Sequence, residues 1–149
     1  MSATIDPSVE ACEAIVSRIN SGGAYTLATP AAYSEREIDL LEKLKRLRVD
    51  VCTGESQTLD ETMDGEQRSS HVLRVWVRKK MDGSTSQINL LKLLVRQLFQ
   101  RLDNYDSPDR RVRVWECDED EKQSPDKALL VTHGLFVTAL TLRVTVEPS

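Results

Sequence analysis

An acidic run near residue 120 contains the residue types that a metal-dependent nuclease uses. Residues 116–122 read Glu-Cys-Asp-Glu-Asp-Glu-Lys, so Asp120 and Lys122 stand two positions apart. Carboxylates there would hold Mg²⁺, and the lysine would steady the charged transition state. The chemistry also needs an acid on a neighbouring strand, and Asp50 is the candidate. Because the run leads directly into Gln-Ser-Pro, a solvated acidic turn is the commoner meaning of this pattern, and nuclease chemistry is kept as an alternative.

Other reactive side chains do not form a recognisable site. His71 and His133 stand at the starts of strand-like segments, without a second ligand at metal-binding spacing. Cys12, Cys52 and Cys117 are far apart and never in CxxC, so they are expected to be small apolar residues. The sequence has no GxSxG motif and no glycine-rich phosphate loop. We therefore expect no catalytic residue, no metal, no cofactor and no enzymatic activity.

Composition sets the class of protein. The 149 residues suit a single domain covering 1–149. Apolar residues make up 40% and charged residues 30%, with a net charge of −4, which argues against broad nucleic-acid binding. No apolar run approaches the roughly 20 residues of a membrane span, and the first residues lack the pattern of a signal peptide. A cytosolic site of synthesis and use is expected.

Two amphipathic segments predict the main helices. The first covers 6–20, with Asp6 as cap, Pro7 in the first turn and a glycine pair after its end. The second covers 86–102 and has the strongest helical periodicity in the chain. Its leucines Leu90 and Leu93 widen the apolar face beyond what a singly buried helix needs. Residues 34–47 predict a short third helix or a turn-rich connection.

The remaining segments predict strands and one long loop. Strands are expected at 24–30, 48–53, 71–78, 111–116 and 128–146, with a bend or bulge at Gly134. Residues 53–69 are polar and acidic, and we expect a long mobile loop there. This order predicts an α+β domain. Its four- to five-stranded, mostly antiparallel sheet is packed by two main helices, the second of them in a crossover position.

The tripeptide Arg-Val-Trp occurs twice and contains both tryptophans, Trp76 and Trp115. In both strands the valines point one way and the Arg and Trp side chains point the other. If the valines face the helices, both tryptophans lie among arginines on the opposite face of the sheet. If the sheet is turned over, both tryptophans belong to the core. The alternation alone leaves both orientations open.

Charges of opposite sign are separated along the chain. Acidic residues concentrate at 55–66 and 116–126. Basic residues form two groups, one around the strand at 71–78 and one from the second helix into the next strand: Arg68, Arg74, Arg78, Lys79 and Lys80, then Lys92, Arg96, Arg101, Arg110, Arg111 and Arg113. Separated surfaces of this kind can bind copies of the same protein head to tail, and contacts that close make rings. An ordinary mixed surface is the alternative, and composition alone does not separate the two.

Over most of its length the chain resembles the tail terminator or tail-completion proteins of tailed bacteriophages. The resemblance rests on the N-terminal amphipathic helix, the tract LLEKLKRLRVDVCT and the long polar segment after it. It continues through the strand HVLRVWVRKK, the helix INLLKLLVRQLFQRL and the final run KALLVTHGLFVTALTLRVTV.

This resemblance implies a non-enzymatic virion structural protein, assembled in the host cytoplasm and located at the tail end or neck. Such a subunit would form a homo-oligomeric ring, a hexamer, on the last ring of the tail tube. Its partners would be copies of itself, the tail tube protein and the neck or head-completion protein, with no membrane and no sequence-specific nucleic acid. Neck and head-completion connector proteins are similar and form the alternative. A small adaptor that binds one protein partner through the Trp-bearing face is a further one.

Two sets of residues are the expected contact sites. The subunit or partner interface would use basic and aromatic side chains of two strands: Arg74, Trp76, Arg78, Lys79, Lys80, Arg113 and Trp115. A docking loop within 53–69 would order on binding and carry acidic residues: Glu55, Asp60, Glu61, Asp64 and Glu66. Plain disorder of this loop is the alternative.

Overall fold

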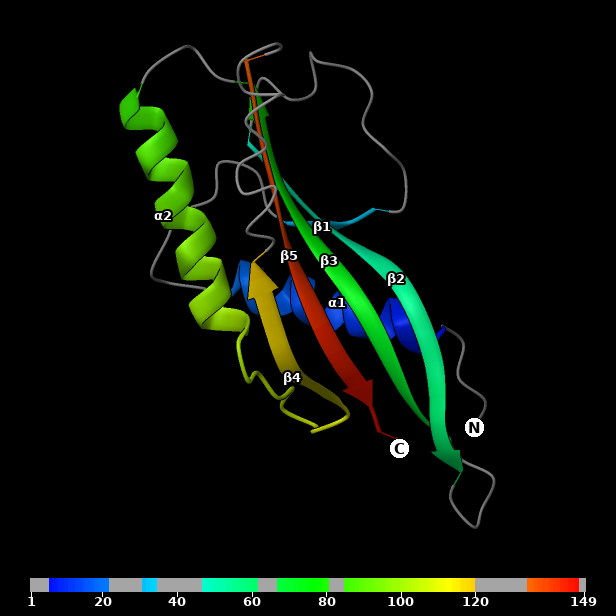
Figure 1. Cartoon of the computed structure of the whole chain (residues 1–149). Helices are drawn as coiled ribbons and strands as arrows, with labels where there is room; N and C mark the ends of the chain where they lie inside the picture. The colour runs from blue at the N-terminus through cyan, green and yellow to red at the C-terminus, as the bar shows by residue number, and fades with distance from the viewer. Residues whose placement is uncertain are drawn as a thin grey trace.

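The chain folds as an α+β domain, as predicted, with a five-stranded mixed, mostly antiparallel sheet packed by two helices (Figure 1). The structure, a computed structural model, describes residues 6–21, 31–34, 47–61, 67–80, 85–119 and 134–147. Its elements follow one another as α1 (Pro7–Asn20), β1 (Ala32–Tyr33), β2 (Arg48–Glu61), β3 (Gln67–Lys80), α2 (Thr85–Leu102), β4 (Val112–Glu119) and β5 (Leu135–Val146).

The strand order is β1-β2-β3-β5-β4. The two-residue strand β1 pairs with β2 in parallel, and every other neighbouring pair is antiparallel. Strand β5 therefore lies between β3 and β4, which run parallel to each other. Helix α2 connects these two strands, so the predicted crossover position is confirmed.

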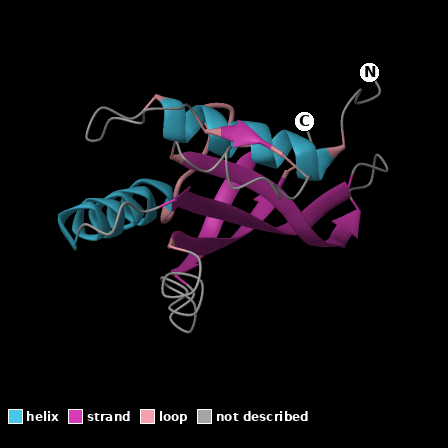
Figure 2. Ribbon diagram, turned by 90° about the horizontal axis from the view of Figure 1, so that it is seen from above, coloured by secondary structure: helices cyan, strands magenta, loops and turns pink. Residues whose placement is uncertain are grey.

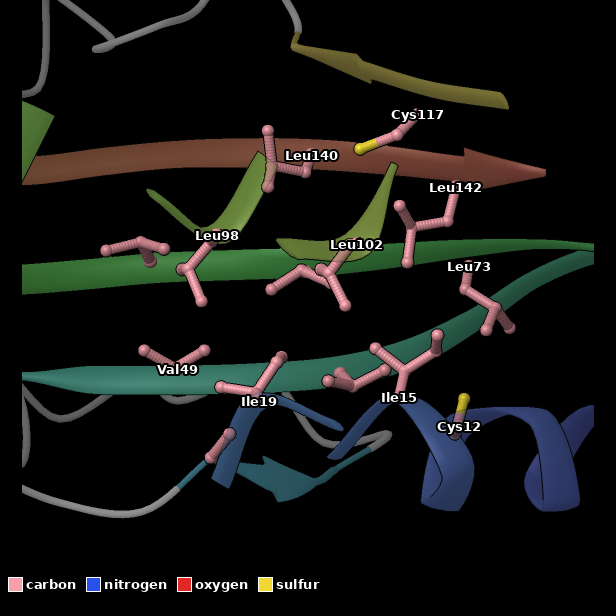
Figure 3. Packing of buried hydrophobic residues seen from close by; sticks show 14 of the residues in the cluster. Cys12, Ile15, Ile19, Val49, Leu73, Leu98, Leu102, Cys117, Leu140 and Leu142 are labelled. Carbon is pink, nitrogen blue, oxygen red and sulfur yellow. The ribbon is translucent and has the colours of Figure 1, made fainter. Parts of the chain in front are cut away.

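Helix α1 begins where the sequence predicts. The Asp6 carboxylate accepts a hydrogen bond from the backbone N–H of Ser8 at 2.9 Å, and Pro7 occupies the first turn. The helix lies along one face of the sheet, and α2 packs at its side (Figure 2). Both helices contribute to a single apolar cluster, in which Ile15 and Ile19 of α1 and Leu98 and Leu102 of α2 are almost fully buried (Figure 3).

The valines of the strands face the helices. Val75 and Val77 on β3 and Val112 and Val114 on β4 are all buried in the same cluster. This decides between the two orientations that the alternation left open. Both tryptophans lie on the opposite face, which we call the outer face of the sheet.

The expected mobile loop at 53–69 is wrong for all of its described residues. Strand β2 continues to Glu61 and β3 begins at Gln67, so the acidic residues Glu55, Asp60 and Glu61 belong to β2. Asp64 and Glu66 lie outside the described residues. The two strands pair through this stretch, from Ser56↔His71 to Glu61↔Gln67, and the backbone hydrogen bonds of the ladder stabilise a ribbon whose sequence is almost entirely polar.

A register shift marks the place where this ribbon leaves the apolar part of β2. It lies between Thr53 and Ser56, around Gly54. A Cβ atom on Gly54 would meet the Val72 carbonyl oxygen at 2.8 Å, so the close approach of the two backbones requires glycine.

Three other expectations fall partly or wholly outside the described residues. These are the strand at 24–30, most of the short helix at 34–47 and the first part of the segment 128–146. The observed β1 follows Pro30, and its register is continued by a hydrogen bond from the Ser34 N–H to the Val51 carbonyl at 3.0 Å. The expected bend at Gly134 is confirmed by its φ of 62°, and β5 begins at the next residue.

Candidate protein-binding face

The outer face of the sheet carries most of the side chains that the sequence marks as an interface. On β3, Arg74, Trp76, Arg78 and Lys80 follow one another at every second position of the strand and therefore share this face. On β4, Arg113 and Trp115 do the same. Lys79 points to the other side, and its ammonium donates to the Lys80 carbonyl at 3.2 Å. Since β3 is an interior strand, its basic residues lie on a face of the sheet and not at an edge.

A buried carboxylate organises one end of this face. Asp50 of β2 is only 2% exposed, and each of its oxygens accepts from a different arginine. Arg48 Nη2 lies 3.2 Å from Oδ1, and Arg78 Nη2 lies 3.0 Å from Oδ2. The Arg78 guanidinium also lies over the Trp76 ring, 5.8 Å from its centroid. Two strands are thereby joined by a charged cluster in which every member has a partner.

This cluster bears on the nuclease alternative. A magnesium ligand needs carboxylate oxygens that are open to the ion, whereas both Asp50 oxygens are taken by guanidinium groups. Asp120 and Lys122 lie outside the described residues. Within the parts of the chain that are described, no group of three or more His, Cys, Asp or Glu side chains is placed to hold a metal ion.

The two tryptophans lie on the same outer face but differ in exposure and in position along the sheet. Trp76 is half-buried and is paired across strands with Ala139 of β5. Trp115 is 52% exposed. It occupies a bulge of β4, since Val114 pairs with Val144 and Glu116 with Arg143. The two rings are therefore four to five residues apart along β5, roughly 15 Å at the usual rise of a strand.

The bulge also brings two acids to the outer face beside Trp115. Glu116 and Asp118 lie two positions apart on β4, which is an edge strand of the sheet. A hydrogen bond with the Asp118 side chain, together with desolvation and the charge of Asp118, raises the pKa of Glu116. Arg143 opposes the shift, with its Nε 3.5 Å from Glu116 Oε2. The sequence predicts a strand that ends at Glu116 and a charged turn after it. That prediction is wrong for residues 117–119, because β4 continues to Glu119.

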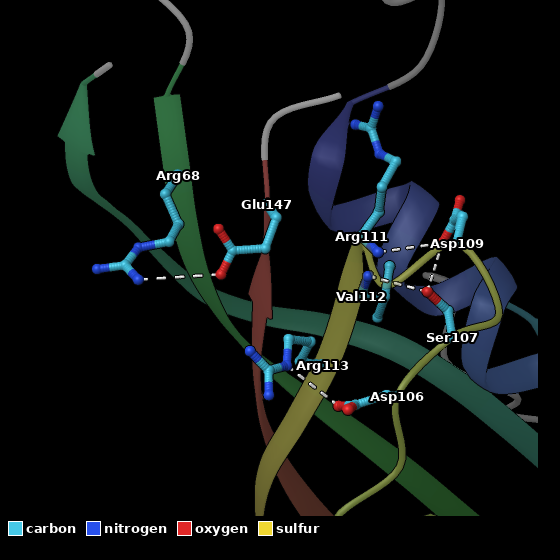
Figure 4. Close-up of polar contacts among 8 residues, drawn as sticks. All are labelled: Arg68, Asp106, Ser107, Asp109, Arg111, Val112, Arg113 and Glu147. Atoms are coloured by element: carbon cyan, nitrogen blue, oxygen red, sulfur yellow. Dashed lines mark hydrogen bonds and ion pairs between the residues drawn. The ribbon is translucent and has the colours of Figure 1, made fainter.

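A cleft of about 710 Å³ opens where the ribbon of β2 and β3 approaches the start of β4 (Figure 4). Its lining combines both charges, hydroxyls and one aromatic ring: Arg68, Ser70, Asn104, Asp106, Arg113, Val114, Trp115, Thr145 and Glu147. Arg113 Nε lies 3.2 Å from Asp106 Oδ1, and Arg68 Nη1 lies 3.9 Å from Glu147 Oε1. Because the two arginines are matched by two carboxylates, the cleft has no net preference for an anion or a cation.

The turn that forms one wall of the cleft is fixed by Ser107. Its N–H donates to the Val112 carbonyl at 2.8 Å, and its hydroxyl oxygen accepts from the Val112 N–H at 3.1 Å. The same hydroxyl donates to Asp109 at 2.5 Å, and the Arg111 N–H donates to that carboxylate at 3.1 Å. These hydrogen bonds lower the pKa of Asp109.

His71 is buried on the face of the sheet that packs against the core. His71 is 4% exposed at the level where β2 and β3 leave the sheet's apolar region, and its Nε2 lies 2.7 Å from the Ser69 hydroxyl. Burial lowers the pKa of His71, and the Asp6 carboxylate opposes that shift. His133 lies outside the described residues.

Sequence reasoning missed the Arg48–Asp50–Arg78 cluster and most of the cleft. Arg48 and Asp50 stand at every second position of a predicted strand, a spacing that could have placed them on one face. The residues of the cleft come from four separate segments, and only the pairing of the strands brings them together.

No protein-family model and no curated protein matches the chain. Neither described helix is long and apolar enough to cross a membrane.

Proposed function

We propose that this protein is a ring-forming structural subunit of a tailed bacteriophage, a tail terminator that caps the tail tube and contacts the head-proximal neck. The observation that carries the proposal is the outer face of the sheet. Trp115 is 52% exposed there, beside exposed arginines, while both described helices pack against the other side. Tryptophan and arginine are the residues most enriched where proteins bind one another.

Two further features support an assembly role. The ribbon of β2 and β3 continues past the last β5 pair, Ser69↔Val146, by two further pairs, Asp60↔Arg68 and Glu61↔Gln67, so its end projects beyond β5. A projecting ribbon offers a neighbouring molecule a surface that the rest of the sheet does not block. Several charged side chains of the outer face are paired with one another, Asp50 with Arg78 and Glu116 with Arg143 among them, which favours a preformed surface.

The proposal is tested by mixing the purified protein with tail tubes assembled from the tube protein of the same genome. Electron microscopy should show rings and tubes that stop growing with a ring at one end, and light scattering should give the mass of about six copies. A protein that remains monomeric and leaves tube length unchanged would overturn the proposal. Rings that bind the head-completion protein and ignore tubes would instead assign the neck role.

A control separates assembly from the nuclease alternative. Plasmid DNA is incubated with the protein and Mg²⁺ or Mn²⁺, alongside the Asp50→Asn variant. The tail terminator proposal predicts intact plasmid in both reactions. Cleavage by the wild type would make the protein an enzyme, and its loss in a variant shown by circular dichroism to be folded would make Asp50 part of the site.

A further inference from the structure

We propose that the subunits of the ring contact one another head to tail, with α2 of one copy docked on the outer face of β4 of the next. Leu90 and Leu93 of α2 would cover Trp115 of the neighbour. Lys92 and Arg96 would face the acids Glu116 and Asp118. The inference rests on the proposed ring assembly and names the surfaces that build it.

Helix α2 presents an unusually apolar outer side. Leu90 is 66% exposed and Leu93 is 51% exposed, although both are leucines on a helix whose other side already supplies the core. Three residues apart, they lie on the same side of the helix. Two exposed leucines that adjoin on one side of a helix form an apolar patch that a partner can cover.

The charge on the same helix has one sign. Lys92 and Arg96 are exposed and four residues apart, so they form a basic row beside the leucines. Residues 85–102 contain no aspartate or glutamate. A partner for this side of α2 must therefore offer an apolar group together with negative charge.

The outer face of β4 offers that combination. Trp115 is the most exposed tryptophan of the chain, and Glu116 and Asp118 lie next to it. Arg143 compensates only one of these acids, and the chain continues with Glu119, Asp120 and Glu121. The negative charges of Glu116 and Asp118 repel each other, and cations of a neighbouring subunit would reduce this repulsion.

The two surfaces also match in length and position. Leu90 to Arg96 spans about 9 Å along a helix, and Trp115 to Asp118 spans about 10 Å along a strand. The first surface lies on α2 and the second on β4, so they share no residue and one copy can use both at once. A contact between two different surfaces is heterologous and forms a ring when the rotation closes. Pairing α2 with α2 would instead set its cations against each other.

Charge reversal tests the contact. One variant carries Lys92→Glu and Arg96→Glu, and the other carries Glu116→Lys and Asp118→Lys. Each alone should lose assembly, since every contact then joins like charges. An equimolar mixture should recover it. When the two variants alternate around the ring, each contact joins either an unchanged α2 to an unchanged β4 or a charge-reversed α2 to a charge-reversed β4. A ring with an even number of subunits allows this alternation. A single chain carrying all four changes should also assemble.

The matched control is Glu13→Lys with Asp103→Lys, which reverses two exposed charges outside both surfaces. It should assemble as the wild type does. Thermal melting checks that each variant is folded, and light scattering on tubes and in solution reports the assembled mass. Recovery by mixing also excludes misfolding as the cause of lost assembly, because two unfolded chains do not restore each other.

The outcomes separate this contact from the proposed function. If the wild type forms rings and both charge-reversed variants form them equally well, α2 and β4 do not make the contact, while the ring proposal stands. If folded variants lose assembly and neither the mixture nor the fourfold variant recovers it, the pairing of these two surfaces is wrong. A wild type that assembles neither in solution nor on tubes overturns both.

Discussion

Arg78 reaches across from β3 to β2 and places its Nη2 atom 3.0 Å from Oδ2 of Asp50, whose residue is only 2% exposed. Arg48 holds the other carboxylate oxygen. A carboxylate in this position joins two strands on the side of the sheet that neither described helix covers. Removing its charge leaves two guanidinium groups close together without an anion between them.

Asp50→Asn is therefore expected to lower the free energy of unfolding by about 2–4 kcal/mol, near the lower end for a broken buried pair because both arginines retain some exposure. Urea denaturation followed by circular dichroism measures the change. Glu13→Gln, at an exposed position of α1, is the control and should change stability by less than about 0.5 kcal/mol. Equal midpoints for wild type and Asp50→Asn would mean that the cluster does not stabilise the sheet.

The unequal exposure of the two tryptophans predicts different fluorescence. With Trp76→Phe, the remaining Trp115 should emit near the wavelength of a solvated indole and shift to shorter wavelength on ring assembly. With Trp115→Phe, the half-buried Trp76 should start at shorter wavelength and change less. Emission spectra of both variants, recorded below and above the assembly concentration, make the comparison. A larger shift from Trp76 would place the subunit contact on β3.

Two leucines of α2 differ in burial and should therefore differ in their contribution to stability. Leu98 is fully buried between α2 and the sheet, so Leu98→Ala should cost about 2–5 kcal/mol, from lost burial plus the cavity left behind. Leu93→Ala, on the same helix but 51% exposed, should cost less than about 1 kcal/mol in the monomer. Chemical denaturation at low protein concentration gives both values. Similar losses in the two variants would contradict the assigned faces of the helix.

The hydrogen bonds to Asp109 predict a dependence of stability on pH. Its pKa is lowered in the folded protein, so the stabilisation is fully present above the unfolded value near 3.8 and is lost as the pH falls through the lower folded value. Asp109→Asn should therefore be less stable than wild type at neutral pH, and the difference should shrink below pH 4. Melting temperatures of both proteins between pH 7 and pH 2.5 provide the test. A constant difference across this range would rule out the charge of Asp109 as the cause.

The elements with apolar periodicity could be predicted from sequence because burial imposes the pattern. In residues 86–102 the apolar residues recur at helical spacing, as they must in a helix packed on one side. The valines of β3 and β4 repeat at every second residue. Which face of the sheet the helices cover could not be read in this way. Alternation is unchanged when the sheet is turned over, and only packing against α1 decides it.

The ribbon of β2 and β3 was missed for a related physical reason. Its cross-strand partners, such as Thr58 and Ser69, are polar on both strands, so no apolar face exists for periodicity to detect. The outward position of Glu116 and Asp118 depends on a bulge that a single strand's sequence does not reveal, because a bulge is defined by the register with β5. The cleft likewise exists only once four segments have been brought together.

The position of β5 in the sheet has a consequence for the order of folding. It is the last of the described strands and yet lies between β3 and β4, and Val146 pairs with both Ser69 and Val112. During synthesis, β4 and α2 emerge from the ribosome before the strand that joins them to β3 exists. Completing the sheet must therefore await residues 135–146, and these pairings between residues distant in sequence favour slow folding. A nascent chain stalled before residue 135 would expose the apolar side of α2 and the unpaired edge of β3, the two surfaces on which a chaperone would act.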